Sequence, residues 1–268
     1  MWLVMNKAVI FKTLAAQEKE HNLRLLALPG AMTILVLAPH PDDFDAIGVT
    51  LRFFHEEGHT VYAAVCVTGS GFEEELKTAL TVSERENIRI EEQKKSIAFF
   101  GLQKERLEFL YVRNEKDEQL AADAENRETV RRFFYETRPD IVFLPHENDS
   151  NRAHRAMYQI AESIAAEANW PIALFLHKDP KTLHMRTDFF LAFDEAEASW
   201  KRELLRFHDS QQKRNIRTRG YGLDERILQL NRQIAKKLPT HLPYAAAFEL
   251  RYFSGVESSS DCLARSLC

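Results

Sequence analysis

The sequence predicts an α/β protein: a Rossmann-like three-layer sandwich with a mostly parallel sheet, plus an N-terminal helix and a small C-terminal elaboration. Apolar runs of strand length alternate with longer segments of helical periodicity, which indicates parallel strands joined by helices on both faces of a sheet. Two of these runs also end abruptly in polar loops rich in His and Asp, as expected at the carboxyl edge of such a sheet.

The central elements follow one another in a regular order. The predicted strands are residues 33–38, 60–67, 107–111 and 140–144, and the predicted helices are residues 44–57, 80–100, 124–137 and 153–168. The strands are identified by continuous apolar character, and the helices by apolar positions at helical spacing among charged residues. Pro41 suits the first position of a helix, and Asn151 is a favoured N-cap residue.

The flanking segments extend this pattern. We expect an added helix at residues 5–26, a mixed segment at 172–193, and helices at 195–207 and 223–237. With 268 residues, 45% of them hydrophobic, the chain is large enough for one substantial α/β domain. We therefore divide it into an N-terminal helical extension (1–30), one main domain (31–250) and a tail (251–268) in which serines 258–260 indicate a loose segment.

Charge and composition narrow the class of function. A net charge of -4 and a pI near 6.2 give no global attraction to nucleic acid. Residues 213–219 form a local basic cluster, which we interpret as a solvated loop, with binding of an anionic substrate group or a phospholipid surface as the alternatives. No Gly-x-Gly-x-x-Gly follows the first strand, which argues against a nucleotide-binding Rossmann protein.

Three cysteines, Cys66, Cys262 and Cys268, are too few and too unevenly spaced for a disulfide framework. The first seven residues lack the pattern of a signal peptide, and no run approaches the roughly 20 apolar residues that span a bilayer. We expect a cytoplasmic protein without a membrane span, and homo-oligomerisation stays open.

A His-Pro-Asp-Asp motif follows the first predicted strand. Imidazole and carboxylate together suit a divalent ion such as Zn²⁺. The three-residue spacing places His40 and Asp43 on roughly the same side of a turn. Adjacent Asp residues point different ways, so one of them can bind the metal while its neighbour handles a proton. The ordinary alternative is that an aspartate caps the following helix and that His40 lines the loop.

The loop after the predicted strand 140–144 supplies further candidate ligands. His146 and His154 both lie there, and Asp149 lies between them. Loops that leave the carboxyl ends of parallel strands converge on one crevice, so this loop can meet the His-Pro-Asp-Asp motif. A catalytic zinc usually takes three protein ligands, and this loop can provide the third.

The order and spacing of several residues from about 33 to about 160 resemble the PIG-L/LmbE-like family of zinc-dependent N-deacetylases, which act mainly on N-acetylglucosamine conjugates. The resemblance is carried by residues 38–43, Gly48, Arg89 with Glu92, Gly101, and the pair His154-Arg155, with weaker similarity at 208–211 and 244–248.

The resemblance implies that His40, Asp43 and His154 bind Zn²⁺ or another divalent metal and that Asp42 is the general base. A zinc-bound water would then attack the acetamide carbonyl of a small amino-sugar conjugate and release acetate and an amine. It also implies that Arg89, Ser70 and His208 contact substrate. The alternatives are a helix-surface salt bridge for Arg89, an ordinary loop at Ser70 and a structural role for His208.

Two departures from the family pattern concern the third-ligand motif. Asn151 stands where relatives carry a His, and Ala153 where they carry its supporting Asp. An Asn amide can donate a hydrogen bond to an oxyanion but cannot titrate, and Asn151 also suits a purely structural N-cap. A third departure is Phe44-Asp45, because relatives commonly place a Glu directly after the paired Asp residues.

Two other functions compete with the deacetylase hypothesis. One is a metal-dependent hydrolase of another bond, such as a phosphoester, for which paired Asp residues are also useful. The other is a catalytically impaired metal-binding or sugar-binding protein, which Asn151 and Ala153 suggest.

Overall fold

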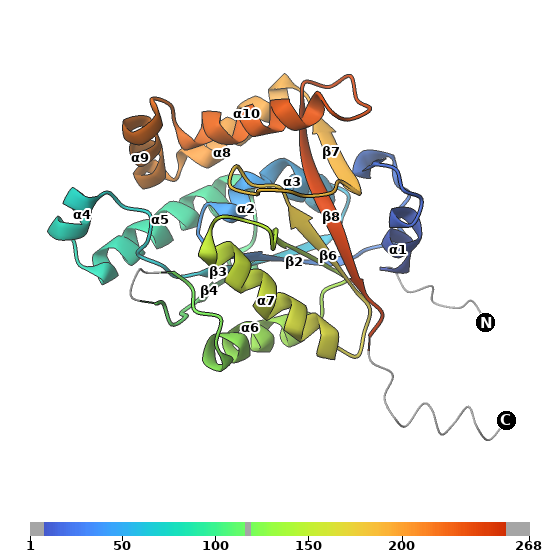
Figure 1. Cartoon of the computed structure of the whole chain (residues 1–268), viewed down its shortest axis with the longest axis horizontal. Helices are drawn as coiled ribbons and strands as arrows, with labels where there is room; N and C mark the ends of the chain where they lie inside the picture. The colour runs from blue at the N-terminus through green and yellow to red at the C-terminus, as the bar shows by residue number, and fades with distance from the viewer. Residues whose placement is uncertain (1–7, 116–118, 256–268) are drawn as a thin grey trace.

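A mixed β-sheet forms the middle layer of the protein, with strand order β1-β7-β8-β6-β5-β2-β3-β4 (Figure 1). The computed structural model describes residues 8–115 and 119–255, and statements about the structure refer to these residues. The strands are β1 His21–Asn22, β2 Thr33–Ala38, β3 Thr60–Cys66, β4 Leu107–Leu110, β5 Ile141–Pro145, β6 Ile172–His177, β7 Phe189–Phe193 and β8 Tyr244–Phe253. All pairings are parallel except those of β8, which runs antiparallel to β6 and β7.

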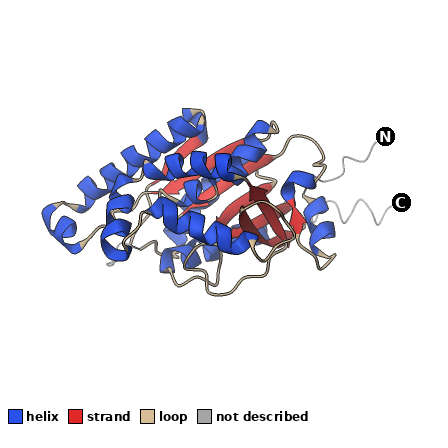
Figure 2. Ribbon diagram, turned by 90° about the horizontal axis from the view of Figure 1, so that it is seen from above, coloured by secondary structure: helices blue, strands red, loops and turns tan. Residues whose placement is uncertain are grey.

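Helices cover both faces of this sheet (Figure 2). They are α1 Val9–Ala15, α2 Asp43–Ala46, α3 Gly48–Glu56, α4 Glu74–Ala79, α5 Val82–Phe100, α6 Ala124–Thr137, α7 Arg152–Glu167, α8 Glu195–Arg206, α9 Asp209–Arg219 and α10 Leu223–Ala235, with 3-10 turns at Leu23–Leu25 and Lys104–Arg106. One core lies between the sheet and α6 and α7. The other packs the sheet against α1, α3, α5 and α8, and includes Phe175, whose ring lies 5.0 Å from that of Phe11 and 5.2 Å from that of Phe143.

The three-layer α/β fold predicted from the sequence is confirmed. The boundaries of the strand at 33–38 and the helix at 124–137 match the structure residue for residue, and the other central elements agree closely. Helix α5 starts at a capping box between Thr81 and Glu84, and it ends at Gly101, whose φ of 90° suits a residue without a Cβ.

Three details of the prediction are wrong. The helix expected at 44–57 is two helices, because the chain turns at Ile47, and the Lys201 ammonium donates to the Ala46 carbonyl at 2.5 Å where the helix breaks. The helix expected at 5–26 ends at Ala15, before a polar stretch that leads into β1. The basic cluster at 213–219 is part of helix α9 and not a solvated loop.

The C-terminal elaboration completes the sheet. Strands β7 and β8 extend it beyond β6, α10 packs on β8, and α8 packs beside α10. Cys66 is buried in β3, whereas Cys262, Cys268 and serines 258–260 lie outside the described residues. The domain boundaries near 30 and 250 stay predictions. Among the described helices, none combines the length and apolar character needed to cross a membrane.

Glu249 links β8 to the loops beside it. Its carboxylate accepts hydrogen bonds from the Arg186 backbone N–H at 2.8 Å and from Arg251, and it lies 3.2 Å from His146 Nε2. Burial raises the pKa of Glu249, but these donors outweigh burial and lower the pKa to about 2.

We therefore expect a pH-dependent loss of stability in Glu249→Gln. The ionised carboxylate stabilises the fold above the unfolded-state pKa of about 4.3, and this contribution disappears as the pH falls towards 2. At pH 7 the variant should lose about 1–3 kcal/mol in the free energy of unfolding, measured by urea denaturation. The difference from wild type should shrink below pH 4.5, whereas the exposed control Glu136→Gln should differ little at any pH.

Candidate metal centre and active site

The candidate site lies where the order of strands reverses. From β2 the chain proceeds to β3 and β4 on one side and then returns to β5 on the other side of β2. Loops at the carboxyl ends of two such strands diverge and leave a crevice between them. The loop after β2 carries His40, Asp42 and Asp43, and the loop after β5 leads to Asn151 and His154. All five residues line one pocket.

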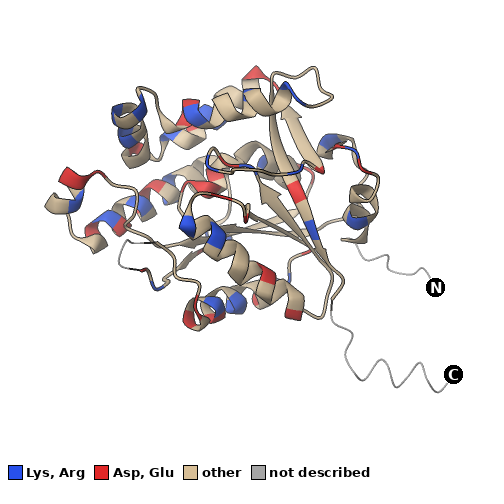
Figure 3. Ribbon diagram, in the orientation of Figure 1, with Lys and Arg blue, Asp and Glu red and all other residues tan. Residues whose placement is uncertain are grey.

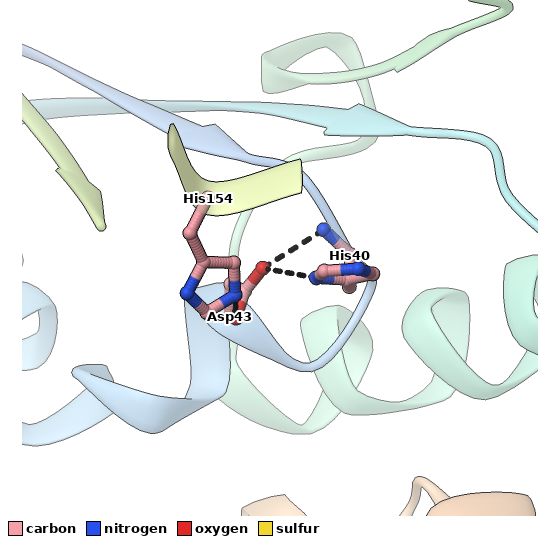
Figure 4. Close-up of side chains that lie close together, drawn as sticks. All are labelled: His40, Asp43 and His154. Atoms are coloured by element: carbon pink, nitrogen blue, oxygen red, sulfur yellow. Dashed lines mark hydrogen bonds and ion pairs between the residues drawn. The ribbon is translucent and has the colours of Figure 1, made fainter. Parts of the chain in front are cut away.

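His40, Asp43 and His154 come together in this crevice (Figure 4). One oxygen of Asp43 accepts hydrogen bonds from the His40 backbone N–H at 2.8 Å and interacts with His40 Nδ1 at 3.0 Å. The other oxygen lies 3.4 Å from His154 Nε2. The two loops that the sequence predicted to converge therefore do so.

These three side chains fit a divalent metal ion. Each offers one ligand atom, and the ligand atoms lie within 4.8 Å of one another. Bonds of about 2.0–2.1 Å in a tetrahedral site would separate neighbouring ligand atoms by roughly 3.3 Å. The Asp43 carboxylate oxygens lie at comparable distances, 3.0 Å from His40 Nδ1 and 3.4 Å from His154 Nε2. Two imidazoles and one carboxylate form a donor set that zinc accepts while a position is left for water. The residues thus suit the metal implied by the sequence.

The second nitrogen of His154 faces another carboxylate. His154 Nδ1 lies 3.2 Å from an oxygen of Asp149, and the Thr182 hydroxyl donates to the same oxygen at 3.2 Å. Although burial lowers it, the carboxylates of Asp43 and Asp149 raise the pKa of His154 to about 10. Burial raises the pKa of Asp43, but His154 and His40 hold it well below its usual range. A carboxylate behind a metal-binding His orients the ring, and Asp149 is placed to do so.

Asp42 lines the pocket and pairs with Arg89. The guanidinium Nη2 lies 2.5 Å from Asp42 Oδ1, and Nη1 donates to the Ser70 carbonyl at 3.2 Å. Burial raises the pKa of Asp42, but Arg89, together with His208 and His40, outweighs burial and lowers the pKa overall, so the carboxylate is ionised at neutral pH. Arg89 is only 2% exposed, and so the alternative of a helix-surface salt bridge is wrong. Arg89 and Ser70 both line the pocket, so a substrate bound there can contact them.

Asn151 has both of the features that the sequence analysis treated as alternatives. It is the N-cap of α7, where its side-chain oxygen accepts from the Ala153 N–H at 3.1 Å, and it also lines the pocket. The cap occupies Oδ1 and leaves the two Nδ2 hydrogens free to donate.

The candidates His208 and His146 do not line the pocket, and neither does His177 at the end of β6. His208 is fully buried behind it and bonds to Asp45, whose carboxylate also accepts from Ser96 at 3.0 Å. The structure therefore places His208 where it supports α2 rather than where it meets a substrate. His146 is held by Glu249 and by the Asn148 N–H. Burial lowers the pKa of His177 to about 4.

The pocket also includes residues that we did not predict as site residues. Asp179 and Lys181 follow β6, and Arg226 belongs to α10. The carboxyl-end rule that identified His40 could have identified Asp179, because Asp179 lies just beyond the end of a parallel strand. Nothing in the local sequence marks Arg226.

Comparisons with known proteins agree with this architecture. Residues 35–165 match the family described as PIG-L: GlcNAc-PI de-N-acetylase. A search of curated proteins found no match.

Several solved structures have a similar fold at low sequence identity. The N,N'-diacetylchitobiose deacetylase from Pyrococcus horikoshii is 20% identical, with 82% of this chain and 84% of that chain covered and a TM-score of 0.67. The 4-carboxy-2-hydroxymuconate hydratase GalB from Pseudomonas putida KT2440 is 18% identical, with 85% and 99% covered and a TM-score of 0.63. The zinc-inhibited form of the teicoplanin deacetylase Orf2 is 14% identical, with 82% and 98% covered and a TM-score of 0.59.

The geometry predicts which histidines a metal needs. His154→Ala removes one of three ligand atoms and should weaken metal binding by more than the 10- to 100-fold typical of losing an outer-shell partner. Competition with a chromogenic chelator measures this affinity. His177→Gln is the matched control, because His177 is equally buried but is not one of the three candidate ligands. Equal loss in both variants, with circular dichroism unchanged, would contradict the assignment.

Proposed function

Because this chain belongs to the PIG-L family, we propose that it is a metal-dependent N-deacetylase that hydrolyses the acetamide of an N-acetylglucosamine-type conjugate. The observation that carries the proposal is the position of Asp42. An ionised carboxylate lines the same pocket as the three-residue ligand set and lies directly beside Asp43 in the chain. This arrangement supplies a base next to the place where a divalent ion would sit.

His40, Asp43 and His154 would hold the ion. When bound, a divalent metal polarises the acetamide carbonyl and makes a water more acidic, and zinc is the metal that this donor set favours. Asp149 would keep the His154 ring in its ligating orientation through Nδ1. Because one solved relative is described as a zinc-inhibited form, the assay should include several divalent metals.

Asp42 would move the protons. Its carboxylate accepts the proton of the attacking water and, once protonated, donates it to the departing amine. The ion pair with Arg89 favours the ionised form needed for the first of these steps and fixes the carboxylate in the pocket. The products are acetate and a free amine on the sugar.

Asn151 would stabilise the oxyanion that develops on the attacked carbonyl. The Nδ2 group donates a hydrogen bond whatever the pH, because an amide does not titrate in this range. In relatives, a His at this position can transfer the proton. In this chain Asp42 alone would transfer it.

The competing functions have distinct products. Acetate release that a chelator abolishes and added metal restores supports the deacetylase. Phosphate release from phosphoesters supports the second hydrolase hypothesis, and stoichiometric metal binding with neither activity supports a binding protein. Because the fold also occurs in a hydratase, the panel should include an unsaturated carboxylic acid.

Asp42→Asn should retain metal and lose activity. Removal of the base should lower kcat for acetate release by about 10²–10⁴-fold. Asp43→Asn should instead weaken metal binding. If Asp42→Asn lost the metal while Asp43→Asn kept it, the base and the ligand would be exchanged.

The variant Asn151→Asp distinguishes the helix-capping role of Asn151 from its proposed role as oxyanion donor. Aspartate caps a helix as well as asparagine does but has no N–H to donate. The melting temperature should therefore change little, while kcat should fall by about 10²–10³-fold, the usual cost of losing one oxyanion donor. Asn151→Ala should lose the same activity and also about 0.5–2 kcal/mol of stability. Full activity in Asn151→Asp would show that Asn151 caps the helix but does not stabilise the oxyanion.

A further inference from the structure

Asp179 brings a further carboxylate to the pocket from a third strand. It lies two residues beyond the end of β6, and it lines the same pocket as Asp42 and His154. Strand β6 pairs with β5 on the side away from β2, so the loop after β6 lies beside the loop that leads to His154. Figure 3 shows the acidic segments of the loops after β2, β5 and β6 at this edge of the sheet. No step of the proposed hydrolysis uses the Asp179 carboxylate.

Hydrogen bonds hold the chain around Asp179 in a defined turn. The Lys181 N–H donates to Asp179 Oδ1 at 2.8 Å, and the Asp179 N–H donates to the Thr182 hydroxyl at 2.9 Å. This turn is joined to the loop after β5, because the Ser150 N–H donates to the Lys181 carbonyl at 3.1 Å. These bonds fix Asp179 relative to the loop that leads to His154.

One oxygen of the Asp179 carboxylate is left for a ligand. Oδ1 accepts the Lys181 N–H, whereas no hydrogen bond or ion pair between the described residues involves Oδ2. One of the carboxylate oxygens lies within 4.8 Å of a ring nitrogen of His154 and of an oxygen of Asp149. Burial raises the pKa of Asp179, and His154 opposes the rise. The carboxylates of Asp43 and Asp149 add to it, so the pKa stays raised. A carboxylate in these surroundings is stabilised by a hydrogen-bond donor or a cation at its free oxygen.

In the order of strands, the ligand set lies between Asp42 and Asp179. The neighbouring strands are β6, β5, β2 and β3. Asp42 follows β2 and pairs with Arg89 of α5, the long helix that leads from β3 to β4. Asp179 follows β6, on the other side of β5. A group bound at the ligand set therefore has one carboxylate on the β3 side and one on the β6 side.

Hydrolysis of a secondary acetamide makes two demands at the same nitrogen. As the carbonyl carbon becomes tetrahedral, the nitrogen gains a lone pair, which takes the proton that Asp42 donates. The nitrogen also keeps its own N–H, which points away from that lone pair. An N–H that loses water in a closed pocket and gains no acceptor is costly. An acceptor on the opposite side of the ligand set from Asp42 meets this second demand.

We propose that Asp179 Oδ2 accepts the N–H of the substrate acetamide and then holds the product amine as its ammonium ion. This inference rests on the proposed function and makes Asp179 the residue that selects amides over esters, because an ester has no hydrogen at this position. Asp179 positions the nitrogen, and proton transfer stays with Asp42. The amine leaves with one hydrogen from the amide and one from Asp42, and it takes a further proton from solvent water.

The first test compares an amide with the matching ester. The substrates are the methyl glycoside of N-acetylglucosamine and methyl 2-O-acetylglucoside, assayed for acetate release by the metal-loaded full chain. Asp179→Asn keeps an oxygen for the Lys181 N–H but replaces the free oxygen with an NH2 group. It should lower kcat/KM for the amide by about ten- to a hundredfold, the range expected for one charge-assisted hydrogen bond, and should not lower kcat/KM for the ester.

Asp209→Asn is the matched control for this ratio. It removes the same charge from an exposed carboxylate that pairs with Lys213 at 2.5 Å and does not line the pocket, so the amide-to-ester ratio should keep its wild-type value. Asp179→Ser repeats the test with a shorter side chain that still accepts the Lys181 N–H. Circular dichroism establishes that each variant is folded. An equal loss for amide and ester in both Asp179 variants would restrict Asp179 to shaping its loop and overturn the inference.

Calorimetry separates failure of this inference from failure of the deacetylase proposal. The metal-loaded chain is titrated with methyl glucosaminide, at a pH where its amine is an ammonium ion, and with methyl glucoside, which has a hydroxyl at the same carbon. Tighter binding of the amine that Asp179→Asn removes would support the inference even without acetate release. Equal binding of the two sugars, or the same loss in Asp209→Asn, would overturn it even if acetate is released.

Metal analysis distinguishes a second possible occupant. Asp149, His154 and Asp179 together could hold a metal ion of their own. One metal ion per chain in both wild type and Asp179→Asn would support an amine-binding role for Asp179. Two ions per chain in wild type and one in Asp179→Asn would assign Asp179 to a second metal site and overturn the inference.

Discussion

The parallel pairing of β2 with β5 is the constraint on which the site depends. This pairing brings the loop after Ala38 beside the loop after Pro145, although about a hundred residues separate them in the chain. Because the chain proceeds in opposite directions from these two strands, the loops diverge and leave room for a ligand. His40 and Asp43 then meet His154 across the gap. Without this pairing, the ligand set would not exist.

A buried polar network holds the turn between β2 and α3 in position. Asp45 is inaccessible to solvent and bonds to Gln93, Ser96 and His208, which come from α5 and from the start of α9. Lys201 of α8 donates a hydrogen bond to the Ala46 carbonyl at the end of α2. The short helix that begins with Asp43 is thus fixed from two sides, which explains how a carboxylate at its first residue can be placed with the precision that a metal site needs.

The pocket combines two electrostatic regions. On one side, carboxylates and imidazoles pair with one another and form a set of ligands that suits a cation. On the other side, α9 and α10 contribute guanidinium groups with no acidic partner among the described residues. Asn151 lies in the first region and serves both as a helix cap and as a neutral donor, which is compatible with the absence of a titrating His at that position.

The sequence alone determined the fold class and the order of the central elements, because local periodicity depends on neighbours in the chain. It also predicted which residues come together as candidate ligands, from a motif at the end of a strand and from the resemblance to a family. Tertiary structure decided the partner of Asp42 and the burial of His208. Asp42 and Arg89 are 47 residues apart, and Asp45 and His208 are 163 apart. A polar side chain takes its role from whichever groups packing brings within a few ångströms, and no periodicity in the sequence encodes that distance.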